Sequence, residues 1–144
     1  MLVVADASVL VPALADTGPG GDAVRARLIE LAGTEPMHVV HTLTQLEVIS
    51  SMHKLVATGK LDEANAERAL RDFVQLPVVR HEVTQPMVPR IWELRGHITP
   101  YEAAYVALVE RLGSEGLMSA CLATADATLH QTPGLSIKIE LFRS

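Results

Sequence analysis

Short apolar runs alternate along the chain with longer segments in which apolar residues recur at helical spacing. The runs predict buried strands, and the segments between them predict amphipathic helices. The expected strands cover residues 2–5, 37–41, 78–79, 117–125 and 136–142, and the expected helices cover residues 7–15, 22–32, 44–57, 61–73, 86–95 and 99–112. Strands that alternate with helices indicate parallel β-α-β units, so we expect a three-layer α/β/α fold with a mostly parallel sheet of roughly four to five strands.

Glycines and capping residues predict where several helices begin and end. Residues 18–21, Gly-Pro-Gly-Gly, predict a loop, and Asp22 is the expected N-cap of the helix that follows. Gly59 and Gly96 are the expected stops of two later helices. The chain has no internal repeat, low-complexity tract or long linker, so residues 1–144 predict a single domain.

The composition fits a compact globular protein with an aliphatic core. Apolar residues make up 49% of the chain, charged residues 20% and aromatic residues only 3%. An aliphatic core suits a parallel sheet whose strands are buried on both faces. The lone cysteine, Cys121, lies in an apolar run, and we expect a small buried side chain rather than a nucleophile.

The sequence predicts neither a membrane span nor a secretory signal, and its net charge is negative. No apolar run approaches the roughly 18 residues of a membrane span, and residues 1–6 lack the basic flank of a secretory signal. Together with the single cysteine, this leads us to expect a cytoplasmic protein. The net charge of −5 gives no indication of nucleic-acid binding, so any role on a polyanion needs a local source of positive charge.

Acidic residues stand at the ends of the predicted elements. Asp6 and Asp126 close two of the strands, while Glu47 and Glu102 lie in the first turns of two helices. In a doubly wound sheet these positions meet at one edge, where several carboxylates repel one another unless a cation lies between them. Oxygen ligands suit Mg²⁺ or Mn²⁺, and such an ion can activate water and neutralise charge on a phosphodiester.

Each of these acids also has a purely structural interpretation. Asp6 and Asp126 are suitable helix N-caps. Glu47 follows Thr44 by the spacing of a capping box, and Glu102 completes a stronger helix-start pattern with Thr99 and Pro100. The sequence pattern alone does not decide, for any of the four acids, between a metal ligand and a helix cap.

Two hydroxyls accompany the acids, and other kinds of site are poorly supported. Ser8 and Thr124 can donate to a carboxylate or a metal-bound water, or serve as local turn hydroxyls. Zinc is disfavoured because the histidines show no ligand spacing, and no Walker loop, dinucleotide fingerprint or nucleophile elbow is present. A phospho-receiver or phosphatase ranks low because Asp6 has no adjacent second acid. The histidines considered are His41, His53, His81, His97 and His130.

Basic residues are scattered, and the sequence predicts no defined RNA-binding surface. A track for RNA would form only if basic side chains face the acidic edge, whereas solvated helix surfaces are the more ordinary role for such residues. The residues considered for this track are Lys54, Lys60, Arg90, Arg95 and His97.

The motifs resemble the PIN-domain family along essentially the whole chain, and within it the VapC toxin ribonucleases of toxin–antitoxin pairs. The resemblance rests on residues 4–8 (Val-Ala-Asp-Ala-Ser), 46–48 (Leu-Glu-Val), 94–108 and 123–126 (Ala-Thr-Ala-Asp). It implies a sheet flanked by helices, RNA cleavage and a carboxylate pocket for Mg²⁺ or Mn²⁺. It gives the metal-binding positions to Asp6, Glu47, Glu102 and Asp126, and the supporting hydroxyl positions to Ser8 and Thr124. A VapB-like antitoxin partner and a homodimer are also implied.

Two departures from the family pattern define the competing hypotheses. Glu102 stands where the family usually has Asp, and residues 113–121 are longer than the usual turn into the next strand. The leading hypothesis is a metal-dependent endoribonuclease toxin that uses an activated water. The alternatives are a catalytically weak PIN-fold binding module, motivated by Glu102, and a PIN nuclease that is not a toxin.

Overall fold

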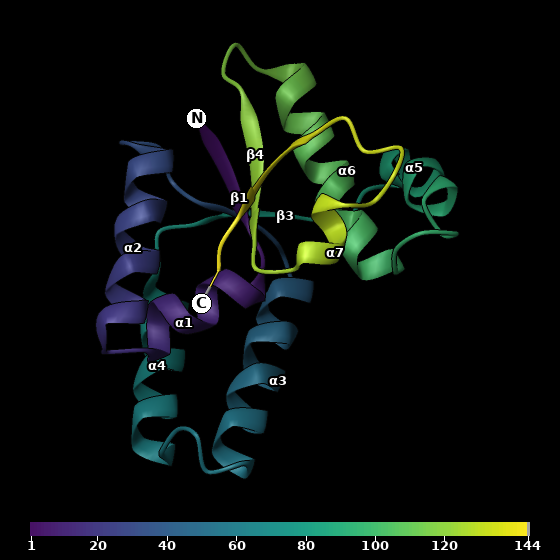
Figure 1. The fold of residues 1–144 in the computed structure, drawn as a ribbon. Helices are drawn as coiled ribbons and strands as arrows, with labels where there is room; N and C mark the ends of the chain where they lie inside the picture. The colour runs from purple at the N-terminus through teal and green to yellow at the C-terminus, as the bar shows by residue number, and fades with distance from the viewer. Residues whose placement is uncertain (144) are drawn as a thin grey trace.

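A central parallel sheet of five strands organises the protein, as a computed structural model that describes residues 1–143 shows (Figure 1). The strand order is β3-β2-β1-β4-β5, and every neighbouring pair is parallel. The strands are β1 (Leu2–Ala5), β2 (His38–Val40), β3 (Val79–His81), β4 (Ala120–Thr124) and β5 (Lys138–Leu141). The predicted α/β fold with a parallel sheet is confirmed.

Helices cover both faces of this sheet. They are α1 (Ala7–Ala15), α2 (Pro19–Ala32), α3 (Leu43–Ala57), α4 (Glu63–Gln75), α5 (Val88–Glu93), α6 (Pro100–Glu115) and α7 (Ala127–His130), with a 3₁₀ turn, η1, at Gln85–Met87. Successive strand residues point to opposite faces. Val4, Val40 and Leu122 therefore pack with α6 in one core, whereas the intervening positions contact helices of the other layer.

The centre of the sheet brings the end of β1 beside the end of β4. Ala5 pairs with Ala123, and the N–H of Asp6 donates to the carbonyl of Ala123 at 3.3 Å. Asp6 and Thr124 therefore leave the sheet at the same carboxyl edge. This is the position at which open α/β sheets place ligands.

The Gly-rich segment predicted as a loop instead opens α2, so that prediction and the Asp22 cap were wrong. Helix α2 begins at Pro19, with Gly18 as its N-cap. A Cβ on Gly21 would lie 1.8 Å from the carbonyl oxygen of Asp16, so only glycine permits this helix to start so close to the end of α1. Asp22 lies in the first turn and forms an ion pair with Arg25.

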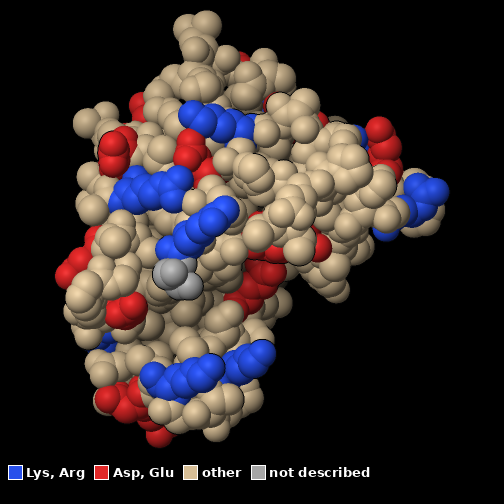
Figure 2. Space-filling model, in the orientation of Figure 1, with Lys and Arg blue, Asp and Glu red and all other residues tan. Residues whose placement is uncertain are grey.

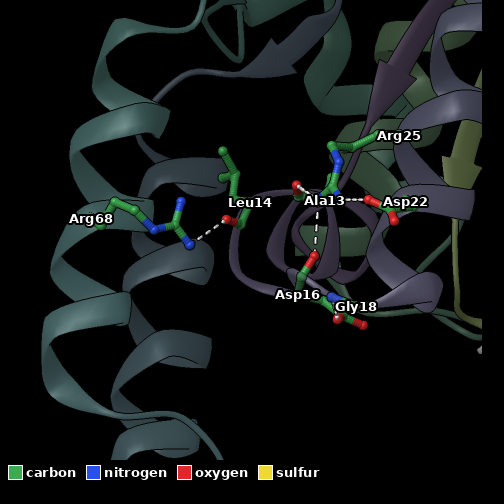
Figure 3. Close-up of polar contacts among 7 residues, drawn as sticks. All are labelled: Ala13, Leu14, Asp16, Gly18, Asp22, Arg25 and Arg68. Carbon is green, nitrogen blue, oxygen red and sulfur yellow. Dashed lines mark hydrogen bonds and ion pairs between the residues drawn. The ribbon is translucent and has the colours of Figure 1, made fainter.

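Two arginines from other helices hold the carboxyl end of α1 (Figure 3). Arg25 donates to the carbonyls of Ala13 and Asp16 at 2.8 and 2.9 Å, and Arg68 of α4 donates to the carbonyl of Leu14 at 3.2 Å. The last carbonyls of a helix have no partner within it, so these contacts satisfy groups that burial would otherwise penalise. They fix α1, which begins directly after Asp6.

Several predicted boundaries shift by a few residues. The helix predicted over 86–95 is divided into η1 and α5, and α6 continues to Glu115. The extension of α6 takes up part of the long segment 113–121, so β4 begins later than predicted, at Ala120. Cys121 is buried, as expected, and burial raises the pKa of its thiol to about 11. Within residues 1–143, no helix combines the length and apolar character needed to cross a bilayer.

Candidate active site

The four acids singled out in the sequence line one cavity of about 620 Å³ at the carboxyl edge of the sheet. Asp6 follows β1, Glu47 comes from α3, Glu102 from the first turn of α6, and Asp126 follows β4. Figure 2 shows acidic side chains in a hollow near the centre of this face. The topology thus assembles, from four separate elements, side chains that span the chain from residue 6 to residue 126.

Asp6 is the most completely held of the four carboxylates. One carboxylate oxygen accepts from the backbone N–H of Ser8 at 3.0 Å and from its hydroxyl at 2.5 Å, while the other accepts from the hydroxyl of Thr124 at 2.5 Å. Burial raises the pKa of Asp6 even though these hydrogen bonds act to lower it. Asp6 also caps α1, so the cap interpretation and a place in the cavity are both correct.

Like Asp6, Asp126 both caps a helix, here α7, and lines the cavity. Its Oδ1 accepts from the backbone N–H and the hydroxyl of Thr128 at 2.9 and 2.6 Å. Burial acts to raise the pKa of Asp126, but the Thr128 hydroxyl and the nearby Glu102 side chain outweigh it and hold that pKa below its ordinary value. The pKa of Asp126 is therefore shifted in the opposite direction from those of Asp6 and Glu47.

A buried chain of hydrogen bonds holds Glu47. The backbone N–H of Val40 donates to the Thr44 hydroxyl at 3.1 Å, that hydroxyl lies 2.7 Å from the Tyr105 hydroxyl, and Tyr105 donates to Oε1 of Glu47 at 2.5 Å. A backbone N–H only donates and a carboxylate only accepts, so the chain has one direction, from Val40 to Glu47. Burial, followed by the charges of Asp6 and Glu102, raises the pKa of Glu47 despite this bond.

The suggested capping box of Thr44 and Glu47 is wrong. A tight γ-turn leads from β2 into α3: Thr42 has φ 66° and ψ −53°, and the N–H of Leu43 donates to the carbonyl of His41 at 2.7 Å. Thr42 is therefore the N-cap, and Thr44 lies inside the helix with its hydroxyl turned to Tyr105. Glu47 is free of any capping role.

Sequence reasoning gave no role to the Tyr105 hydroxyl and considered Thr44 only as a helix cap. The hydroxyl of Tyr105 needs a partner because the residue is only 3% exposed, and this partner comes from α3, 58 residues earlier in the sequence. A buried tyrosine three residues after Glu102, on the same face of one helix, was the available indication.

Glu102 forms a complete capping box with Thr99. The Thr99 N–H donates to Oε1 of Glu102 at 2.9 Å, and the Glu102 N–H donates to the Thr99 hydroxyl at 3.1 Å. The capping interpretation is therefore confirmed, and Glu102 lines the acidic cavity as well. Oε1 of its carboxylate is engaged by the cap, and the Glu102 side chain also lies near Asp126.

Curated proteins with related sequences are ribonucleases named VapC. A VapC ribonuclease of Mycobacterium bovis and Ribonuclease VapC9 of Mycobacterium tuberculosis are each 35% identical to the chain over 131 residues, which is 91% of both chains. Ribonuclease VapC1 of M. tuberculosis is 31% identical over 140 residues, 97% of both chains. The chain belongs to the VapC ribonuclease family.

Comparison with solved structures supports the fold of this family member. The crystal structure of VapBC2 from Rickettsia felis, bound to a DNA fragment of its promoter, matches with a TM-score of 0.64 and covers 99% of both chains. Because the sequence identity is 14%, this likeness concerns the fold alone. No protein-family model matches the chain.

The donor set of the cavity suits a hard divalent cation. Carboxylate and hydroxyl oxygens are the ligands that Mg²⁺ and Mn²⁺ accept, and no soft ligand lines the cavity within residues 1–143. In that same part of the chain, no three acidic, histidine or cysteine side chains are close enough to form a preformed metal cage. Each acid is instead held by a protein donor, so what fits the cation is the chemical type of the ligands.

Of the five residues predicted as candidates for an RNA track, three lie away from the acidic cavity and two lie beside it. Arg90 is engaged by Glu110 at 2.9 Å and by Glu93 at 3.2 Å, and Arg95 stacks on the Trp92 ring at 4.2 Å. Neither arginine lines the acidic cavity, nor does the exposed His97. The remaining two, Lys54 and Lys60, line a groove beside that cavity.

A second group of titratable residues lies between β2 and β3, away from the acids. Nδ1 of His38 and Nε2 of His81 are 2.7 Å apart, and the two rings stack with centroids 5.0 Å apart. Burial lowers the pKa of both histidines. His38 was not considered in the sequence, and the contact depends on the register of two strands that the pattern does not fix.

Proposed function

We propose that the chain is a Mg²⁺- or Mn²⁺-dependent endoribonuclease, the toxin of a VapBC-type toxin–antitoxin pair. The single observation that carries this proposal is the convergence of Asp6, Glu47, Glu102 and Asp126 on one open cavity. The relatives named ribonuclease support RNA as the substrate, and their similarity extends over nearly the whole chain.

The residues of the cavity have two kinds of role: some would bind the cation, and others orient those ligands. Asp6, Glu47, Glu102 and Asp126 would hold the cation, which supplies positive charge and activates water for attack on a phosphodiester. The hydroxyls of Ser8 and Thr124 keep Asp6 in one orientation, and Tyr105 does the same for Glu47. Such outer contacts fix the ligands and reduce the reorganisation needed when charge develops.

Electrostatics supports a cation at this place. The raised pKa values of Asp6 and Glu47 reflect burial, and for Glu47 the neighbouring acids as well. A divalent cation offsets this repulsion and lets an acidic cavity receive a phosphate. It thereby reconciles a net charge of −5 with an RNA substrate.

Partners and location follow from the same proposal. A VapB-like antitoxin would bind the protein and suppress cleavage, and a homodimer in the cytoplasm is the expected assembly. The Rickettsia felis relative in fold is a VapBC complex, which supports an antitoxin partner. The direct check of this partner is to examine the gene upstream and, where it encodes a short antitoxin-like protein, to co-express the two.

The test is RNA cleavage by the purified protein with Mg²⁺ or Mn²⁺. We expect cleavage that EDTA abolishes and that Asp6→Asn reduces to background. Undiminished cleavage by Asp6→Asn would exclude this mechanism. Cleavage of RNA in the absence of any upstream antitoxin gene would indicate a PIN nuclease that is not a toxin.

A second candidate function is a catalytically weak PIN-fold binding module. The observation that favours it is the capping box, in which Oε1 of Glu102 accepts from the backbone N–H of Thr99. On this hypothesis Glu102→Asp, the residue usual in the family, raises cleavage sharply from near zero. A fully active wild-type protein would exclude it.

A further inference from the structure

The acidic cavity continues into a smaller groove between α1 and α3. The two share Ala7, Ser8 and Ser51 in their linings, and the smaller groove has a volume of about 280 Å³. Lys54 and Lys60 line it beyond these shared residues. We call it the lysine groove.

One face of α3 connects the acids to the lysines. Glu47, Ser51, Lys54 and Thr58 follow one another at intervals of four, three and four residues, so they form a polar stripe along the helix and its C-cap. At 1.5 Å per residue, Lys54 lies roughly 10 Å along the axis from Glu47. A strand that leaves the acidic cavity along this stripe therefore reaches the lysines directly.

The two lysines are available to an external anion. The chain contains only three lysines, and Lys138 is paired with Glu140 at 3.2 Å. Lys54 and Lys60 are exposed, and within residues 1–143 no carboxylate lies within ion-pair distance of either. In Figure 2, basic side chains lie on the α3–α4 side of the hollow that holds the acids.

We propose that the lysine groove binds backbone phosphates of the RNA strand whose scissile phosphate lies in the acidic cavity, with Lys54 and Lys60 as the phosphate contacts. This inference rests on the proposed function and adds the path of the substrate. Lysine contacts phosphate as a point charge, so these residues position the strand without reading its bases. They also supply the local positive charge that an acidic protein needs to attract RNA.

A structural role for Lys54 is distinguishable from this one. Lys54 lies in the last turn of α3, where a cation interacts favourably with the helix dipole. That role changes the melting temperature and leaves RNA binding and its salt dependence unchanged. Lys60 lies beyond the end of α3 and has no such role.

The experiment measures binding of fluorescein-labelled single-stranded RNA oligonucleotides of two unrelated sequences by fluorescence anisotropy at several salt concentrations. The variants Lys54→Gln, Lys60→Gln and the double variant are made in the Asp6→Asn background, which prevents cleavage. Each lysine is expected to contribute roughly threefold to tenfold to affinity, equally for both sequences. Each substitution should also reduce the slope of log affinity against log salt by about 0.7.

The matched control is Lys138→Gln, which removes the third lysine and should change neither affinity nor slope. In the active protein, Lys54→Gln and Lys60→Gln should raise KM and leave kcat within about twofold. Affinity and salt slope equal to those of Lys138→Gln would overturn the proposal, as would a fall in kcat at constant KM. Absence of cleavage by the wild type, with lysine-dependent binding retained, would instead count against the proposed function alone.

Discussion

The acidic cavity and the His38–His81 pair are two regions where the fold buries titratable side chains, and burial acts on them in opposite directions. It raises the pKa of Asp6 and Glu47 and lowers the pKa of both histidines. In each case burial favours the neutral form, because charge is poorly solvated inside a protein.

The two regions differ in what faces the buried groups. The histidines satisfy one another through a contact of 2.7 Å and need no charge. The acids face an open cavity of about 620 Å³, and hydroxyl donors from three other residues favour their ionised forms. Burial and hydroxyl donors therefore act in opposite directions on the acids beside the opening, whereas the histidines satisfy one another in their neutral forms.

The largest expected effect is that of Asp6→Asn, which should change RNA cleavage and protein stability in opposite directions. Asp6→Asn keeps the shape of the side chain and removes its charge, so RNA cleavage should fall by about 100-fold or more. Because the pKa of Asp6 is raised, its ionised form destabilises the metal-free protein at neutral pH. The melting temperature of Asp6→Asn in EDTA should therefore rise by roughly 2–5 °C.

Differential scanning calorimetry and a cleavage assay on the same preparations provide both numbers. The exposed Glu67→Gln is the control and should match the wild type in each. A variant that loses stability along with activity would show that the hydroxyl bonds of Ser8 and Thr124 to the carboxylate outweigh the cost of burying its charge, because Asn caps a helix as well as Asp.

The next prediction concerns the hydrogen-bond chain behind Glu47. Tyr105→Phe leaves the packed ring and removes the donor to Glu47, so Mn²⁺ affinity measured by electron paramagnetic resonance should weaken about 10- to 100-fold. Thr44→Val should act in the same direction, whereas Thr44→Ser keeps the hydroxyl and should restore affinity. If Tyr105 acts through Glu47, Tyr105→Phe has no further effect in a Glu47→Gln background, and an additive effect there would contradict this role.

The sheet and the strand-end acids were accessible from sequence because local rules determine them. A buried strand that ends in Asp6 and a second that ends near Asp126 must, in a parallel sheet, finish at the same edge. The family resemblance added Glu47 and Glu102, which have capping interpretations of their own.

Contacts between distant segments were not accessible. The Tyr105–Glu47 bond joins residues 58 apart and the His38–His81 contact joins residues 43 apart, and both depend on packing and register. The start of α2 was missed for a similar reason, because the close approach of Gly21 to the Asp16 carbonyl exists only in the folded protein. The lysine groove likewise required knowing which face of α3 points to α1.

A smaller effect is expected from the His38–His81 pair, which should make the stability of the protein depend on pH. The pKa values of His38 and His81 lie below the ordinary value of 6.5, so protonation favours the unfolded state. Their contribution to stability is present above pH 6.5 and is lost as the pH falls through the lowered pKa values. The charges that face the pair are Glu35, Arg111 and Glu115.

Urea unfolding of the wild type and His81→Gln across this pH range measures the contribution. The difference in the free energy of unfolding should shrink with falling pH, with a slope of at most about 1.4 kcal/mol per pH unit for each proton. A difference that does not vary with pH would show that the pair does not titrate in this range.

The smallest expected effect separates the cap of α6 from the cavity. Thr99→Ala removes the hydroxyl that caps the helix but keeps the backbone N–H that donates to Glu102. The free energy of unfolding should fall by about 1 kcal/mol, and cleavage at saturating metal should stay within about twofold. A loss of cleavage much larger than this would mean that the hydroxyl itself helps to place Glu102.

Mn²⁺ binding in the absence of RNA tests the central claim most directly, because it does not require the natural RNA target. Isothermal titration calorimetry should show saturable binding to the wild-type protein and strongly weakened binding to Asp6→Asn and Asp126→Asn, with Glu67→Gln unchanged. Equal Mn²⁺ affinity in all of these variants, or no binding to the wild type, would contradict a metal-dependent nuclease site in the acidic cavity.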